Sequence, residues 1–523
     1  MLRREVLAAG MAVLAMPAIG AETRVLRFVP QADLAVLDPV WTTAYQTRDH
    51  GFLVFDTLFG QDAAFRTQPQ MVAGVETSTD GLVWRLTLRE GLRFHDGTPV
   101  LARDCAASVR RWGARDGFGQ ALMAAAGEVG AESDRVVRFR LRAPFPLLPD
   151  ALAKTSPSAC FMMPERLAAT DPYTQVTEMV GSGPFRYLAG ERVAGSRVVY
   201  ERFLGYVPRG EGVASRTAGP KVAHFDRVEW QIIQDSATAA AALQQGEVDW
   251  WFVANTDLLP VLRGNAGVRV AAQDPAGIIA TMRFNQLQAP FDNAAVRRAL
   301  LPAIVQADYM TAVSGPDRAL WADGVGYFCP GTPMASDAGM AALTGPRSVD
   351  AAKRGLESAG YKGERVALLL PTDIESVRAL AEVTADLFRK LGLNVDAQTM
   401  DWPTAIQRRA NRGPVEQGGW SVFQTSWSGT DQLNPAVHVF LRGNGTDAAP
   451  GWPSSARIEA LRGEWFRAGD LSAQKAVARA MQEQAFRDLP YIPLGQQFQQ
   501  TAYRAEISGI LTGLPVFWNV RRG

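Results

Sequence analysis

The chain of 523 residues carries 54 Lys and Arg against 53 Asp and Glu, which gives a formal net charge of +1. This near-equal balance of charges argues against nucleic acid or another polyanion as a partner. Its length exceeds what one hydrophobic core usually organises and predicts two or three domains. The cysteines are too few and too scattered for a disulfide framework, so at most one bridge can form, and we expect three small buried thiols: Cys105, Cys160 and Cys329.

The first 21 residues have the parts of a secretory signal peptide. Arg3 and Arg4 precede an apolar run over 6–19, and small residues follow at 18–21. The run is short for a membrane span, which needs about 20 apolar residues. The arginine pair resembles a twin-arginine signal, although Leu2 stands before it, so Sec and Tat export both stay open. With no cysteine near the cleavage point, we expect a freely diffusing periplasmic protein.

The stretch 74–112 is predicted to form a strand, a turn and a helix. Apolar and polar residues alternate over 84–89, as in a half-buried strand, and Asp-Gly turns at 80–81 and 96–97 bracket it. From Ala102 onward the apolar residues recur at three- and four-residue spacing, so one helical face packs against the strand. That face carries Cys105, Ala106, Val109 and Trp112.

Further elements follow along the chain. Residues 25–29 alternate as a first strand, and alternating arginines at 138, 140 and 142 mark a strand with one solvated face. Ser236 is expected to cap an alanine-rich helix that Gly246 ends, and Asp292 or Asn293 to cap another. A later helix over 376–391 ends at Gly392 before a strand. Its apolar face comprises Val377, Leu380, Ala381, Thr384, Leu387, Phe388 and Leu391.

Several short motifs, taken together, resemble one protein family. The tryptophan strand leading to Phe-His-Asp-Gly-Thr-Pro at 94–99 closely resembles the signature of the family 5 substrate-binding proteins of ABC importers, which include peptide, dipeptide, nickel and opine binders. Gly-Ser-Gly-Pro-Phe at 181–185, Gly-Glu-Val-Asp at 246–249, the segment 282–301 and Leu-Pro-Tyr-Ile-Pro-Leu at 489–494 are similar to later family segments. The resemblance covers essentially the whole mature chain.

The resemblance implies a fold and a function. The expected fold is α/β and like the type II periplasmic binding proteins, with two lobes joined by a hinge. Three domains are expected: a discontinuous first domain (22–50, 181–275 and 488–523), a second (51–180) and a third (276–487). The expected function is to capture a short peptide or other small solute between the lobes and deliver it to the ABC permease in the inner membrane. We expect no cofactor, and we expect the protein to be a monomer.

The segment 419–440 is expected to line the cleft. In peptide-binding members of the family a tryptophan is followed three residues later by an aspartate that pairs with the ligand's amino group. Trp427 matches the tryptophan, but the third residue on is Thr430, and Asp431 comes one later. Either the loop bulges and Asp431 still meets a cation, or the ammonium site is lost. Tyr45 and Gln496 are further candidate cleft residues, since their polar groups suit amides or hydroxyls.

A secreted hydrolase and a nickel-chelate receptor also stay open at this point. Ser472 and Lys475 satisfy the SxxK motif of penicillin-binding proteins and serine β-lactamases, but the KTG-like Lys-Thr-Ser at 154–156 precedes it, opposite to the order those enzymes use. Ser472 also suits a helix cap after Asp470. For a nickel chelate, His438 could add one ligand, although a single imidazole makes a poor metal site. Ser182, between glycines, is expected to be structural.

Overall fold

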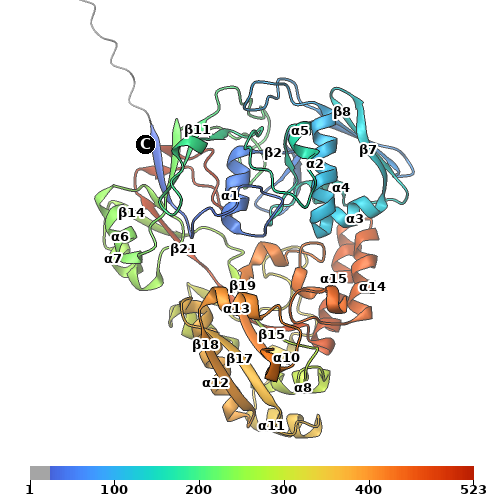
Figure 1. Cartoon of the computed structure of the whole chain (residues 1–523), viewed down its shortest axis with the longest axis vertical. Coiled ribbons are helices and arrows are strands. Elements are labelled where there is room, and N and C mark those ends of the chain that lie inside the picture. Colours follow the sequence, from blue (N-terminus) through green and yellow to red (C-terminus); the bar gives the residue numbers. More distant parts are fainter. Residues whose placement is uncertain (1–23) are drawn as a thin grey trace, which may run out of the picture.

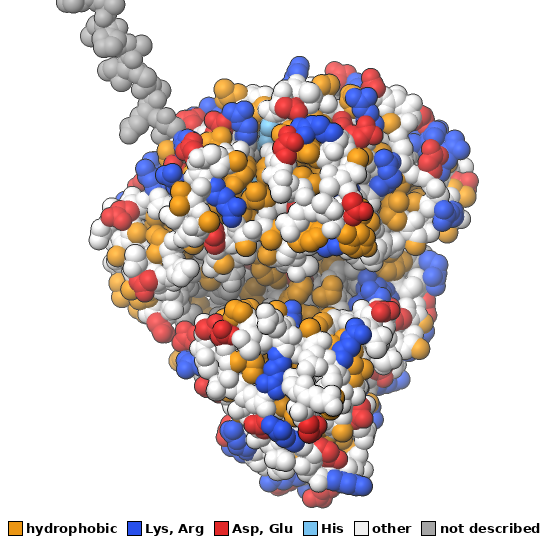
Figure 2. Space-filling view, in the orientation of Figure 1, with side chains coloured by type: hydrophobic (Ala, Val, Ile, Leu, Met, Phe, Trp, Pro, Cys, Tyr) orange, Lys and Arg blue, Asp and Glu red, His pale blue; other side chains and the backbone are white. Residues whose placement is uncertain are grey.

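The computed structural model describes residues 24–523. They form a broad upper lobe and a narrower lower lobe (Figure 1), and the space-filling view shows a hollow running between the two (Figure 2). The larger sheets have seven, six and four strands. The expected signal peptide over 1–21 lies outside the described residues. Within 24–523, every helix is too short or too polar to span a bilayer.

The seven-stranded sheet of the upper lobe combines three distant parts of the chain. Its first strand has the predicted bounds 25–29 and runs parallel to both of its neighbours. Phe28 is buried there, with its ring centroid 4.9 Å from that of Phe517 and 5.0 Å from that of Trp250. The strand order is β10 (Phe185–Tyr187), β11 (Arg197–Arg202), β12 (Arg227–Gln231), β1 (Val25–Val29), β13 (Trp250–Trp251), β21 (Gln500–Arg504) and β14 (Val268–Ala272).

The stretch 74–112 forms the predicted strand, turn and helix in the upper lobe. The helix α2 (Ala102–Arg115) buries Trp112, whose indole N–H donates to the Ser158 carbonyl at 2.7 Å. Arg138 and Arg140 pair with Glu128 on the exposed side, which confirms the solvated sheet face. The antiparallel sheet has the order β5 (Val72–Thr77), β6 (Val83–Leu88), β8 (Val136–Leu141) and β7 (Ala126–Ser133).

The six-stranded sheet organises the lower lobe. The predicted helix over 376–391 is α12 (Glu375–Lys390), which joins two parallel strands. It buries every residue predicted on its face except Leu387, which is half-buried. The strand order is β16 (Trp321–Ala322), β20 (Tyr491–Gln497), β15 (Ile278–Phe284), β19 (Val422–Ser428), β17 (Arg365–Pro371) and β18 (Asn394–Met400).

The remaining elements surround these sheets. In the upper lobe they are α1 (Tyr45–Val54), β2 (Asp56–Thr57), β3 (Phe59–Gln61), β4 (Thr67–Pro69), α3 (Gly117–Ala125), α4 (Leu148–Leu152), β9 (Phe161–Met162), α5 (Glu165–Ala168), α6 (Ser236–Gln245), α7 (Leu259–Arg263), β22 (Ile507–Ser508) and β23 (Arg521–Arg522). In the lower lobe they are α8 (Ala294–Leu300), α9 (Gln306–Ser314), α10 (Ala341–Thr344), α11 (Val349–Ser358), α13 (Trp402–Arg408), α14 (Ala456–Arg467) and α15 (Leu471–Asp488).

Helix caps match the sequence expectation only in part. Asn293 caps α8, and Gly246 ends α6 at a φ of 79°. Ser236 and Ser472 are not caps, because each helix is already capped by the aspartate before it: Asp235 accepts from the Thr238 N–H at 2.7 Å, and Asp470 from the Ala473 N–H at 2.8 Å. A capping side chain belongs to the residue just before the first helical residue, whereas both serines already lie inside their helices.

The two lobes are joined by two neighbouring chain crossings, which we call the hinge. The chain leaves the seven-stranded sheet at β14 and enters the six-stranded sheet at β15 through residues 273–277, and it returns from β20 to β21 through residues 498–499. Since β15 pairs with β20 and β14 with β21, the crossings lie side by side. Residues 491–497 therefore pair in the lower sheet, although the expected boundary at 488 assigned them to the first domain. The three-domain division itself stays a prediction.

The three cysteines are free and buried, as expected. Burial raises the pKa of all three thiols, so the reactive thiolate form is disfavoured.

A buried ion pair ties the start of the chain to α2. The Arg111 guanidinium lies 2.7 Å from the Asp38 carboxylate, and both side chains are almost completely buried. Asp38 also accepts from the backbone N–H of Val40 and Val176. Such a pair is costly to break on one side, because the remaining charge is buried without a partner.

We therefore expect Arg111→Met to lower the free energy of unfolding by about 3–5 kcal/mol. Arg103→Met is the matched control on the same helix, because Arg103 is exposed and its contact to Glu165 is 3.6 Å long; it should change stability by less than about 1 kcal/mol. Urea unfolding followed by far-ultraviolet circular dichroism measures both. Equal effects would contradict the importance of the buried pair.

Candidate ligand-binding site

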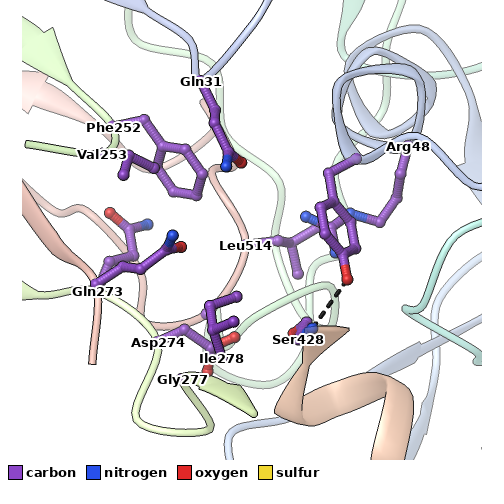
Figure 3. Close-up of a pocket in the computed structure, with 13 residues that line it drawn as sticks. Gln31, Arg48, Phe252, Val253, Gln273, Asp274, Gly277, Ile278, Ser428 and Leu514 are labelled. Atoms are coloured by element: carbon purple, nitrogen blue, oxygen red, sulfur yellow. Dashed lines mark hydrogen bonds between the residues drawn. The ribbon is translucent and has the colours of Figure 1, made fainter. Parts of the chain in front are cut away.

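A cavity lies at the hinge, between the lobes, with about 540 Å³ of empty space; we call it the hinge cavity. The upper lobe contributes Gln31, Tyr45 and Arg48, and the lower lobe Ile278 and Ser428. Figure 3 shows the Gln31 side chain reaching into the space beside Phe252, with Gln273 and Asp274 on the hinge side. The remaining lining residues are Val253, Gly277, Gln499, Gly513 and Leu514.

The Tyr45 hydroxyl connects the lobes beside this cavity. Tyr45 is the first residue of α1, in the upper lobe. Its O–H donates to Asp431 Oδ2 at 2.6 Å and accepts from the Ser428 N–H at 2.9 Å, both in the lower lobe (Figure 3 marks the bond to Ser428). Burial and the nearby carboxylate raise the pKa of Tyr45 well above its usual value, so the hydroxyl keeps its proton. We call these two hydrogen bonds the Tyr45 bridge.

Asp431 is a buried carboxylate with one oxygen unused. It lies in a 3₁₀ turn over 429–432, just after β19, and is 2% exposed. Oδ2 accepts from Tyr45, whereas Oδ1 has no hydrogen-bond partner within residues 24–523. Burial raises the pKa of Asp431 to about 6, although the Tyr45 hydrogen bond opposes the shift. A buried acceptor without a partner indicates a group that a ligand or water would satisfy.

Two further cavities lie between the lobes and share Lys154, Ser156 and Val437. The first, which we call the Asp431 cavity, encloses about 470 Å³ and is also lined by Trp427 and Asp431. The second, the Thr430 cavity, encloses about 640 Å³ and is also lined by Thr430. Residues of both lobes therefore line each of these two cavities.

The structure brings four of the five predicted site residues together. Tyr45 lines the hinge cavity, Thr430 the Thr430 cavity, and Trp427 and Asp431 the Asp431 cavity. Trp427 is half-buried and meets Phe440 edge-on at 4.9 Å. The Thr430 hydroxyl lies 2.8 Å from the Ser428 hydroxyl, which fixes the turn that carries Asp431.

The fifth predicted residue, Gln496, lies apart from the other four. Its amide donates to the Ala276 carbonyl at 2.7 Å, and it lines none of the three cavities. Gln499, three residues later, lines the hinge cavity instead. A ligand contact by Gln496 stays a prediction.

Sequence reasoning missed several residues that line these cavities. Gln273 follows the end of β14 and begins the crossing, and its Oε1 is buried without a partner among the described residues. Lys154 was considered only as part of a KTG-like motif, yet it lines two cavities. The sequence signal that could have found Gln273 is a polar residue directly after a strand that leads into the hinge.

Two other polar candidates, His438 and Ser182, make hydrogen bonds within the protein that support its structure. His438 is 1% exposed, and its Nε2 lies 2.9 Å from the Tyr327 carbonyl and 2.8 Å from the Tyr491 hydroxyl; burial lowers its pKa to about 3. Ser182 bonds the Met162 carbonyl, and a Cβ on the preceding Gly181 would lie 1.9 Å from the Val54 carbonyl oxygen. The glycines here therefore permit close backbone approach, as expected.

Removing the Tyr45 hydroxyl tests the bridge. Tyr45→Phe keeps the ring but loses both inter-lobe hydrogen bonds, so we expect the population of the closed form without ligand to fall by about 5- to 50-fold relative to the open form. Small-angle X-ray scattering should show a larger radius of gyration. Tyr173→Phe is the control, because Tyr173 is 65% exposed; a radius unchanged in both variants would contradict the bridge.

The raised pKa of Asp431 predicts a dependence of stability on pH. An acid whose pKa is raised by folding is destabilising once it ionises, so the contribution of Asp431 is fully present below pH 3.8 and lost as pH rises through about 6. The loss amounts to about 3 kcal/mol, at about 1.4 kcal/mol per pKa unit. The thermal unfolding midpoint of the wild type should therefore fall relative to that of Asp431→Asn between pH 4 and pH 7. A constant difference would show that Asp431 keeps its usual pKa.

Comparisons with known proteins agree with this architecture. Residues 66–447 match the family described as bacterial extracellular solute-binding proteins, family 5 Middle. The probable peptide ABC transporter periplasmic-binding protein y4tO of Sinorhizobium fredii is 36% identical over 502 residues, which cover 94% of this chain and 92% of that protein.

Two solved structures share the fold at low identity. PBP AgaA from A. tumefaciens R10, in complex with agropinic acid, has a TM-score of 0.77 at 18% identity, covering 95% of this chain and 99% of that one. The dipeptide-binding protein of Pseudoalteromonas sp. SM9913, in complex with Met-Leu, has a TM-score of 0.76 at 20% identity, covering 96% and 100%. The fold is therefore that of the type II periplasmic binding proteins, as expected. The chain belongs to family 5 of the bacterial extracellular solute-binding proteins, which serve ABC importers.

Proposed function

We propose that this protein captures a short peptide with a free amino terminus between its lobes and presents the closed form to an ABC permease in the inner membrane. The observation that carries the proposal is the unused oxygen of Asp431, buried between the lobes beside Tyr45. An ammonium group is the natural partner of such a carboxylate, since a charge-assisted hydrogen bond would satisfy Oδ1 and stabilise the ionised form. The name of the Sinorhizobium fredii relative supports a peptide as the solute.

The hinge cavity supports recognition of a peptide backbone. Gln31, Gln273 and Gln499 line it, and an amide side chain can both donate to a peptide carbonyl and accept from a peptide N–H. Gln273 Oε1 is buried and unsatisfied among the described residues, so it is a ready acceptor. Phe252 and Ile278 add apolar surface beside these amides.

Binding is coupled to closure through population shift. Residues of both lobes line each of the three cavities, so a ligand gains its full set of contacts only when the lobes are together. A ligand with more contacts in the closed form shifts the equilibrium toward it. The Tyr45 bridge already favours that form without ligand, which lowers the free energy that the ligand must supply.

For the segment after Trp427 we adopt the interpretation in which the loop bulges and Asp431 still meets a cation. The 3₁₀ turn over 429–432 absorbs the extra residue and leaves Asp431, rather than Thr430, hydrogen-bonded to the other lobe. The opposite interpretation, a ligand without an ammonium group, predicts no effect of Asp431 on affinity.

The hydrolase and nickel-chelate hypotheses receive no support from the geometry. Ser472 and Lys475 are both exposed near the start of α15, whereas a serine hydrolase needs its nucleophile in a site that holds substrate. His438 is engaged by Tyr327 and Tyr491 and is not among the residues that line the three cavities. We therefore propose a receptor without enzymatic activity, exported to the periplasm by Sec or Tat and acting as a monomer.

Asp431→Asn tests the amino-terminal contact. The substitution keeps the shape but removes the charge, so we expect affinity for the dipeptide Met-Leu to fall about 10- to 100-fold at pH 7.5. N-acetyl-Met-Leu should bind the wild type as weakly as Met-Leu binds the variant. Isothermal titration calorimetry measures all of these affinities.

Asp447→Asn is the matched control, because Asp447 is exposed in the same lobe; it should leave the affinity for Met-Leu unchanged. Equal affinity of the wild type and Asp431→Asn for Met-Leu would overturn the amine contact. Native mass spectrometry showing a co-purified solute without an amino group would overturn the peptide class.

A further inference from the structure

Arg462, in the middle of α14, is a buried cation without a carboxylate partner. Its side chain lines the Asp431 cavity, and the residue is 7% exposed. One Nη donates to the Ala436 carbonyl at 3.0 Å, and the guanidinium lies 5.2 Å from the centre of the Phe466 ring. Within residues 24–523 no carboxylate oxygen lies within 4.0 Å of its guanidinium nitrogens, the limit for an ion pair. Burial and the nearby Arg442 lower the pKa of Arg462 to about 9, although Glu459 and Asp116 oppose the shift, so nearby carboxylates offset the cost of burying this charge only in part.

The other basic groups of this cavity are already paired with carboxylates. Lys154 pairs with Asp116 and donates to the carbonyls of Pro157 and Ser158, and Asp116 Oδ1 caps α3. Arg442 lies 3.0 Å from Glu459. Arg48, in the hinge cavity, pairs with Asp49 at 2.7 Å. Of the arginines that line these three cavities, Arg462 is therefore the one without an ion pair among the described residues, and Glu459 and Asp116 attract it only from beyond ion-pair distance.

Two further donors that line these cavities also lack partners among the described residues, and one of them, Ser156, shares the Asp431 cavity with Arg462. Ser156 is 5% exposed, its hydroxyl has no hydrogen-bond partner among the described residues, and it lines both the Asp431 and the Thr430 cavities. Trp465 is 2% exposed, and its indole N–H, a donor only, is likewise unsatisfied in the lining of the Thr430 cavity. A cation and unsatisfied hydrogen-bond donors, contributed by both lobes, are the requirements of an anion site.

We infer that Arg462 and Ser156 form a subsite for an anionic group of the solute, so that the Asp431 cavity accepts a zwitterion. This inference rests on the proposed function for the location of the amino group, at Asp431 Oδ1. The same cavity then offers an acceptor for the ammonium and a planar guanidinium fork for a carboxylate. An anion held between α14 of the lower lobe and Ser156 of the upper lobe also draws the lobes together.

The first experiment tests the anion subsite without any assumption about the whole solute. Acetate is titrated into the ligand-free protein at constant ionic strength with chloride, and the thermal midpoint is followed. We expect saturable stabilisation of the wild type, its loss in Arg462→Gln, and partial retention in Arg462→Lys, which keeps the charge but not the fork. Arg467→Gln is the matched control, since Arg467 is exposed on the same helix; it should behave as the wild type does.

Absence of saturable stabilisation in the wild type, or equal stabilisation in Arg462→Gln, would overturn the subsite. The thermal midpoint of each variant without acetate shows that it folds. If Arg462→Gln does not fold, Ser156→Ala replaces it and should weaken the acetate effect.

A second experiment separates this inference from the proposed function. Met-Leu and its carboxy-terminal amide are compared by calorimetry. We expect the wild type to prefer the acid at least about tenfold and Arg462→Gln to lose that preference while binding the amide unchanged. An equal loss of affinity for the acid and for the amide would assign Arg462 to lobe packing and overturn the subsite. Failure of both peptides to bind, together with the acetate effect in the wild type, would contradict the peptide proposal alone.

Discussion

Two adjacent chain crossings constrain how this molecule can move, and the site depends on that constraint. The hinge at 273–277 and 498–499 is flanked by paired strands on both sides, β14 with β21 above and β15 with β20 below. Relative motion of the lobes is therefore confined to a few backbone residues, as in hinge closure generally. In this structure α14, on the lower lobe, contacts the upper lobe through Phe466, whose ring lies 5.8 Å from that of Phe118.

Burial between the lobes sets the electrostatic properties of the site. It is the largest cause of the shifted pKa values of Asp431, Tyr45 and Arg462. Their shifted pKa values record a cost of desolvation that partners within the described residues do not fully offset. A solute that supplies the missing charges lowers that cost in the closed form alone. The free energy of ligand binding and the free energy of lobe closure are therefore coupled.

The sequence predicted repeating patterns well and pairwise contacts poorly. The spacing of apolar residues predicted β1, the strand and helix of 74–112 and the buried face of α12. This spacing arises because one side of each element packs against the core. The convergence of Tyr45, Trp427, Thr430 and Asp431 followed from family resemblance. Arg462 and Gln273 were missed because the absence of a partner is a property of three-dimensional surroundings. The capping residues were misplaced by one or two positions, since the sequence does not fix where helical backbone angles begin.

The pairing of β21 also orders the assembly of the protein during synthesis. β14 has β21 as its neighbour in the seven-stranded sheet, through pairs such as Val270 with Ala502. Residues 278–497, by contrast, contain every strand of the six-stranded sheet. Every strand of that sheet therefore precedes β21 in the chain, whereas the seven-stranded sheet needs β21 to hold β14. The second crossing of the hinge can thus form only after the strands of the lower sheet have been synthesised.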